Sequence, residues 1–102
     1  MNKYVYLISD LNSYTYKIGI SNNPEKRVKQ LQTGNEKPLK IIHKILCENY
    51  LEVERALHNQ YNFLRVNGEW FELTENDVNN FPESCNKIDE NFKIIKSFKL
   101  YL

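Results

Sequence analysis

The chain lacks the cysteine pattern of a disulfide scaffold or a zinc module. Its two cysteines, Cys47 and Cys85, lie far apart, with no C-x-x-C pair and no Cys/His cluster at zinc-finger spacing. Each thiol is therefore expected to be reduced and to pack as a small hydrophobic residue. The sequence gives no basis for a structural zinc site.

Long hydrophobic segments are also lacking. No apolar run approaches the roughly 20 residues that span a bilayer, and the first residues lead directly into a strand-like pattern. No internal repeat, low-complexity segment or linker divides the 102 residues, and this length is too short for two independent cores. We therefore expect a single domain over residues 1–102, a cytoplasmic or intracellular location and no membrane partner.

The charge is small overall but unevenly distributed. A net charge of +1 at pH 7 predicts no strong general attraction to nucleic acid. Residues 17–44 nevertheless carry seven basic and two acidic side chains, a net charge of +5. The rest of the chain carries seven basic and eleven acidic side chains, a net charge of −4. A locally basic face could hold the backbone of a polyanion. On charge alone, a solvated lysine-rich face is an equal alternative.

Two strand-like segments open the chain. Residues 3–9 and 15–21 are rich in aromatic and β-branched residues, and turn-prone residues lie between them, which predicts an antiparallel hairpin. Matching the apolar faces predicts four facing pairs: Val5 with Ile18, Leu7 with Tyr16, Tyr6 with Lys17 and Tyr4 with Gly19.

Helix and strand patterns alternate in the middle of the chain. Capping and first-turn residues predict a helix from Pro24 to about Thr33. Alternating apolar residues predict a strand over residues 38–48. Apolar residues at helical spacing predict a second helix from Tyr50 to about Arg65. Residues 68–73 are then predicted to form a short strand after a turn.

The C-terminal third is expected to be helical. Residues 74–77 match a capping box that opens a helix, which Pro82 is expected to end or interrupt with a loop. Residues 89–102 fit both strand alternation and helical spacing, and helix is preferred.

Five short motifs follow one another at compatible distances. They are YVYLI at 4–8, YKIGIS at 16–21, NPEKR at 23–27, ERALH at 54–58 and GEWF at 68–71. Over residues 3–73 this set resembles the GIY-YIG nuclease superfamily, and particularly a phage-associated branch with a Leu-His pair before a G-E-W-F strand. The resemblance implies an α/β (α+β) fold, with a small three-stranded antiparallel sheet flanked by helices and an additional short edge strand near Trp70. Residues 74–102 would be a C-terminal extension.

The resemblance also implies the site residues. Tyr6 falls on the tyrosine of the first triplet, Arg27 on the arginine of the following helix and Glu54 on the glutamate that binds metal in the family. Lys17 stands where the family has the tyrosine of the second triplet. This departure puts in doubt any mechanism that requires two tyrosines.

These residue types suit phosphodiester cleavage. Arg27 offers a cationic fork for phosphate, and Glu54 is a hard oxygen ligand for Mg²⁺ or Mn²⁺. Tyr6 could orient or deprotonate the attacking water if positive charge from Lys17 and Arg27 lowered its pKa, which is about 10 in a free tyrosine. His58, one turn beyond Glu54, could contact phosphate or support the site.

The sequence thus predicts a metal-dependent endonuclease that hydrolyses DNA. DNA is preferred to RNA through the resemblance alone, and a homodimer is compatible with the chain. Four basic residues are predicted to contact nucleic acid: Lys26, Lys29, Lys40 and Lys44.

Alternative interpretations remain open at this point. Taken singly, Tyr6 would be a packing aromatic, Lys17 a solvent-facing strand residue and His58 a surface histidine. Trp70 is expected to be a core or lid aromatic rather than a platform for base stacking. The main functional alternative is a non-catalytic nucleic-acid-binding module on the same fold, and a third is a protein-interaction domain.

Overall fold

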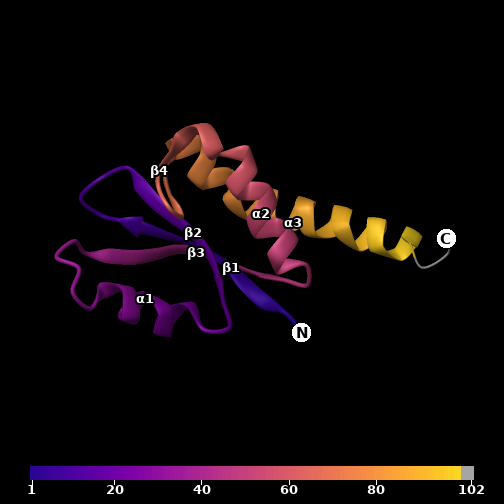
Figure 1. Ribbon diagram of the computed structural model, residues 1–102, viewed down its shortest axis with the longest axis horizontal. Helices are drawn as coiled ribbons and strands as arrows, with labels where there is room; N and C mark the ends of the chain where they lie inside the picture. Colours follow the sequence, from indigo (N-terminus) through magenta and orange to yellow (C-terminus); the bar gives the residue numbers. More distant parts are fainter. Residues whose placement is uncertain (100–102) are drawn as a thin grey trace.

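The computed structural model describes residues 1–99, which form one antiparallel sheet covered by helices on both faces (Figure 1). The strands are β1 (Lys3–Asp10), β2 (Thr15–Ser21), β3 (Leu39–Cys47), β4 (Arg65–Asn67) and β5 (Trp70–Glu72). The helices are α1 (Pro24–Gln32), α2 (Tyr50–Gln60) and α3 (Glu75–Lys99), with a short 3₁₀ turn at Asn62–Leu64. The predicted class, an antiparallel sheet flanked by helices, is confirmed.

The number of strands was underestimated. The sheet has five strands in the order β3-β1-β2-β5-β4, so β4 lies at the edge and β5 lies inside. The sequence predicted three strands and an edge strand near Trp70, with a helix continuing to about Arg65. The helix ends at Gln60 instead, and Gly68, at a φ of +55°, turns the chain between β4 and β5. Phe63, which lies within the predicted helix range, is 81% exposed in the 3₁₀ turn.

The two faces of the sheet are covered differently. In Figure 1, α1 covers one face, while α2 and α3 pack on the other. The main hydrophobic core lies on the α2 and α3 side. Both cysteines are buried there, which agrees with the expectation that they pack as small hydrophobic residues.

The β1–β2 register differs from the predicted one by two residues. Tyr6 pairs with Gly19 rather than Lys17, and Lys17 pairs with Ile8. A shift of two residues keeps every side chain on its predicted face, so the apolar pattern could not distinguish the two registers. The turn decides between them, because the Asp10 carboxylate accepts the Asn12 N–H (3.0 Å) and its carbonyl accepts the Ser13 N–H (3.1 Å).

A bulge alters the predicted face of β3. The pairing of β1 with β3 shifts between Leu7 and Ile8, so that Lys44 lies opposite Tyr6 whereas Lys40 lies opposite Ser9. Tyr6 and Ser9 point to opposite faces of β1, because side chains alternate along a strand. Lys40 and Lys44, four residues apart, therefore lie on opposite faces of the sheet.

Helix α3 begins at the predicted capping box but does not stop at Pro82. Thr74 and Asp77 exchange backbone-to-side-chain hydrogen bonds of 3.0 and 3.1 Å, and the helix then runs through Pro82 to Lys99. Proline removes the N–H that the Val78 carbonyl would accept. His43 of β3 donates to that carbonyl instead (Nε2–O 3.0 Å). The helix predicted over residues 89–102 is confirmed as far as Lys99, and residues 100–102 lie outside the described residues.

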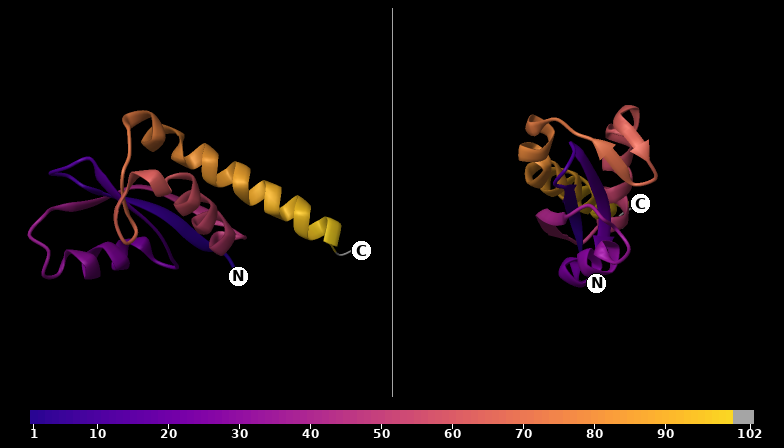
Figure 2. Two further views of the ribbon diagram at one scale, coloured as in Figure 1. Left: turned by 45° about the horizontal axis from the view of Figure 1, so that its top comes forward. Right: turned by 90° about the vertical axis from the view of Figure 1, so that its left-hand side faces the viewer.

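The last turns of α3 extend past the end of the sheet (Figure 2). Before that point, the buried Asp89 accepts the backbone N–H of Asn49 (2.8 Å) at the start of α2 and so fixes the two helices together. Within residues 1–99, none of the helices combines the length and hydrophobicity that crossing a membrane requires.

Candidate active site

Tyr6 lies on the α1 side of the sheet, across from Gly19. It is only 2% exposed. A Cβ at residue 19 would overlap the Tyr6 hydroxyl and ring, so the tyrosine occupies the space that the missing side chain leaves. Side chains alternate along β2, so Lys17 points to this same face. The predicted proximity of Tyr6 and Lys17 thus survives the corrected register, although they do not face each other directly.

Arg27 reaches Tyr6 from α1. Asn23 caps the N-terminus of the helix by accepting the Lys26 N–H, and Arg27, in the first turn, is half-buried. Burial raises the pKa of Tyr6 above its ordinary value of 10, and hydrogen bonding from Arg27 opposes that rise without cancelling it. The charges of Glu69 and Glu54 raise it further. A Tyr6 pKa lowered by Lys17 and Arg27, which the sequence required for a basic tyrosine, is therefore not found.

Lys17 is buried and paired. It is 7% exposed, which removes the interpretation of a solvent-facing residue. Its Nζ lies 2.7 Å from Oε1 of Glu69, in the turn before β5, and 5.9 Å from the centre of the Trp70 ring. Glu69 was not among the residues predicted from the sequence. The signal was present, because a buried lysine needs a carboxylate partner and the GEWF motif contains one.

Glu54 and His58 approach the site from α2. The His58 Nε2 donates to the carbonyl of Ile18 (2.9 Å), just beyond the part of β2 that pairs with β5, and the ring meets Phe71 edge-on. His58 is therefore not a surface residue. Burial, and next the negative charge of Glu69, raise the pKa of the half-buried Glu54, while His58 and Lys17 act in the opposite direction.

Three of these side chains form a set that fits a divalent cation. The ligand atoms of Glu54, His58 and Glu69 lie within 4.8 Å of one another. Two carboxylates this close repel each other, and a cation between them removes that repulsion. Carboxylate oxygens with an imidazole suit a small divalent ion such as Mg²⁺ or Mn²⁺. The sequence identified Glu54 as a ligand and His58 as a site residue but missed Glu69.

The four lysines predicted to contact nucleic acid do not form one surface. Lys26 and Lys29 are exposed on α1, and Lys44 lies beside them on the same side of the sheet, paired with Glu25. Lys40 lies on the opposite face. Beside Arg27, a hollow of about 360 Å³ at the start of α1 is lined by residues 21–23, Lys26 and Gln30.

Comparison with protein families identifies a relationship that agrees with this arrangement. The model of the T5orf172 domain matches residues 3–86, a segment that includes every candidate site residue and ends within α3. This domain is phage-associated and related to GIY-YIG-like nuclease and DNA-binding modules. Comparison with curated proteins and with solved structures gave no match. The chain belongs to the T5orf172 domain family.

Proposed function

We propose that this protein is a divalent-metal-dependent endonuclease that hydrolyses phosphodiester bonds in DNA. The observation that carries the proposal is the convergence of five chemically suited side chains on one stretch of β2. They come from five different segments: Tyr6 (β1), Lys17 (β2), Arg27 (α1), Glu54 (α2) and Glu69 (β4–β5 turn). The family relationship to nuclease and DNA-binding modules supports the same conclusion.

The positively charged groups would hold the phosphate. Arg27 presents a planar fork that matches two phosphate oxygens, and Lys17 adds a second positive charge from β2. The charge that develops on the phosphoryl oxygens in the transition state would be stabilised by both. Glu69 keeps Lys17 in place before the substrate arrives, because their ion pair is partly shielded from water.

Tyr6 would receive the proton of the attacking water. As the water oxygen bonds to phosphorus and the bond to the leaving oxygen breaks, the Tyr6 phenolate takes up the proton. Because the pKa of Tyr6 is raised, the phenolate is a minor species at neutral pH but a strong base. Arg27 stabilises that phenolate by donating a hydrogen bond to its oxygen. A divalent ion held by Glu54, Glu69 and His58 would stabilise the leaving oxygen.

The direct test is incubation of the purified chain with supercoiled plasmid DNA and Mg²⁺ or Mn²⁺. We expect nicked and then linear DNA, and no product in excess chelator. Salt-sensitive DNA binding without cleavage would instead favour the non-catalytic nucleic-acid-binding module. That alternative is supported by Lys17, which replaces the family tyrosine and is already paired with Glu69. If the protein neither cleaves nor binds DNA, the remaining interpretation is a protein-interaction domain.

A further inference from the structure

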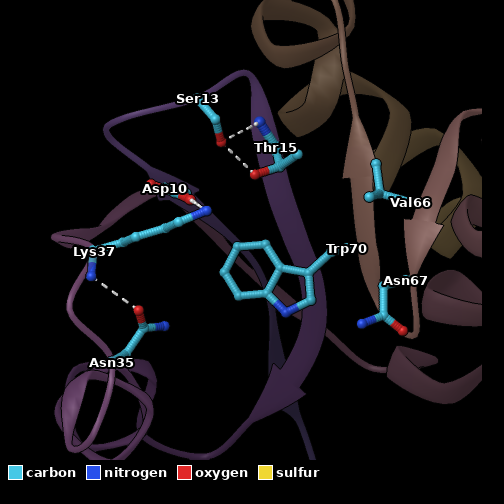
Figure 3. Close-up of a pocket in the computed structure, with 8 residues that line it drawn as sticks. All are labelled: Asp10, Ser13, Thr15, Asn35, Lys37, Val66, Asn67 and Trp70. Atoms are coloured by element: carbon cyan, nitrogen blue, oxygen red, sulfur yellow. Dashed lines mark hydrogen bonds and ion pairs between the residues drawn. The ribbon is translucent and has the colours of Figure 1, made fainter.

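A second hollow opens on the same side of the sheet as Tyr6 and Lys17 (Figure 3). Its volume is about 410 Å³, within the range of pockets that enclose small organic groups. It is bounded by the β1–β2 turn, the α1–β3 loop and the β4–β5 hairpin. The lining residues are Asp10, Ser13, Thr15, Asn35, Lys37, Val66, Asn67 and Trp70.

Trp70 connects this hollow to the candidate active site. It pairs with Lys17 across β2 and β5, and the Lys17 Nζ lies 5.9 Å from the centre of its ring. The indole is half-buried and projects into the middle of the hollow (Figure 3). Trp70 is therefore not enclosed in the core. Its ring lines the hollow and also lies next to Lys17 of the proposed phosphate site.

Polar groups surround the indole. Asn35 and Asn67 lie at the wall. The side-chain oxygen of Asn35 accepts the Lys37 N–H (3.0 Å), so Asn35 offers chiefly its amide donors, whereas Asn67 can both donate and accept. The hydroxyls of Ser13 and Thr15 lie on the β1–β2 side and are hydrogen-bonded to each other (2.6 Å). An aromatic platform with mixed donors and acceptors at its edge suits a flat heterocycle that carries both kinds of group.

An ion pair lies at the open side of the hollow. Lys37 pairs with Asp10 (3.3 Å), whose side chain is 5% exposed, whereas the Lys37 side chain is 61% exposed. The buried carboxylate thus holds a lysine at the solvent boundary. Lys17, over the indole, is likewise paired with Glu69. Each ammonium has three N–H donors and its carboxylate partner uses only part of them, so the remaining donors suit the phosphate oxygens attached to a bound base.

We propose that this hollow binds an unpaired nucleobase, stacked on Trp70, of the nucleic acid strand whose phosphate lies at Lys17 and Arg27. This inference rests on the proposed function. Stacking on aromatic side chains is a general mode of recognition for single-stranded nucleic acid. A base within a duplex is already stacked on both faces and must leave the helix before it can enter such a hollow. The preferred substrate is therefore single-stranded, frayed or branched DNA rather than a regular duplex.

Trp70 is the only tryptophan in the chain, so its fluorescence reports directly on the hollow. The experiment uses the full chain with Glu54→Gln, which is expected to remove cleavage, in excess chelator, and a fluorescein-labelled single-stranded DNA oligonucleotide. Anisotropy measures binding, and tryptophan emission measures contact with Trp70. We expect saturable quenching. An oligonucleotide of the same length with abasic sites should bind about tenfold to a hundredfold more weakly and should not quench.

Two variants test the position of the contact. Trp70→Ala should weaken binding of the intact oligonucleotide to the level of the abasic one. Because Trp70 is half-buried, circular dichroism must show that this variant folds. Asn67→Ala alters the exposed hairpin and should reduce affinity severalfold while leaving the circular dichroism unchanged. The comparison of intact with abasic DNA needs neither variant, so a misfolded variant does not weaken the test.

Equal binding of intact and abasic oligonucleotides, with unchanged tryptophan emission, would overturn the proposal for the hollow. If the wild-type protein still nicks plasmid DNA in that case, the proposed nuclease function stands without the base-binding hollow. If the protein neither binds DNA nor cleaves it, both proposals are wrong.

Discussion

Tyr6 and Gly19 face each other across β1 and β2, and the tyrosine occupies the volume that any side chain at residue 19 would need. This relationship gives the glycine a steric role. The glycine lets the phenol lie against the backbone of β2, where Arg27 donates a hydrogen bond to it. The orientation of the tyrosine therefore depends on a residue that has no chemistry of its own.

Gly19→Ala is accordingly predicted to displace Tyr6. We expect a loss of about 1–3 kcal/mol in the free energy of unfolding, typical of overpacking, and a loss of most cleavage activity. Urea denaturation measures the first and plasmid nicking the second. In the double variant with Tyr6→Ala, the added methyl group should cost much less. Equal costs of Gly19→Ala in the two backgrounds would show that the contact has no energetic importance.

Lys17→Met is predicted to shift the acid side of the pH–rate profile. Lys17 lowers the pKa of Glu54, which burial and Glu69 raise, so its removal should raise that pKa further. Glu54 must be ionised to bind a cation, and a higher pKa means that activity appears only at higher pH. Most activity at neutral pH should also be lost. Lys17→Arg should retain the charge and part of the rate.

The control for this prediction is Lys96→Met. Lys96 pairs with Glu52 on the same helix as Glu54 but outside the candidate site. Its removal should leave the acid side of the profile in place. An unchanged profile in Lys17→Met, with full cleavage, would exclude Lys17 from the site.

The alkaline side of the profile tests Tyr6. A base acts when it is deprotonated, and burial raises the pKa of Tyr6 above 10. The rate should therefore keep increasing with pH through the range in which a free tyrosine would already level off. Tyr6→Phe should give a low rate without this increase. A plateau near neutral pH in the wild-type protein would mean that Tyr6 orients the water and does not accept its proton.

Much of the site could be predicted from local sequence. Tyr6, Arg27 and Glu54 lie in short motifs that can be identified from their order and spacing along the chain. The structure brings all three residues to one place. The register of β1 and β2 could not be predicted, because a shift of two residues satisfies the same alternation. Glu69 was missed because its importance depends on Lys17, 52 residues earlier in the chain.

Two errors in the fold have a similar origin. The apolar spacing of α2 continues to Leu64 although the helix ends at Gln60, since Leu64 packs against the core from the 3₁₀ turn. Pro82 is an ordinary helix breaker by local rules. It is tolerated because His43, distant in sequence, hydrogen-bonds the carbonyl that proline leaves free.

His43 and Pro82 are predicted to be energetically coupled through the Val78 carbonyl. His43→Ala should leave the Val78 carbonyl without its partner and reduce the free energy of unfolding by about 1–3 kcal/mol. In a Pro82→Ala background, the new N–H at residue 82 can serve that carbonyl, so His43→Ala should cost less. Thermal or urea unfolding of the four proteins measures the coupling. Additive effects would contradict the proposed compensation.

The most direct test of the account compares two glutamates of α2. Glu54 belongs to the candidate metal set, whereas Glu52, two residues earlier, pairs with Lys96 outside it. Each is changed to Gln, the fold is checked by circular dichroism, and nicking of supercoiled DNA is measured over a series of Mn²⁺ concentrations. We predict that Glu52→Gln cleaves like the wild type. Glu54→Gln should lose at least a hundredfold in rate, as is typical when a preorganised charged group is removed. Undiminished cleavage by folded Glu54→Gln protein would contradict the assignment of this site.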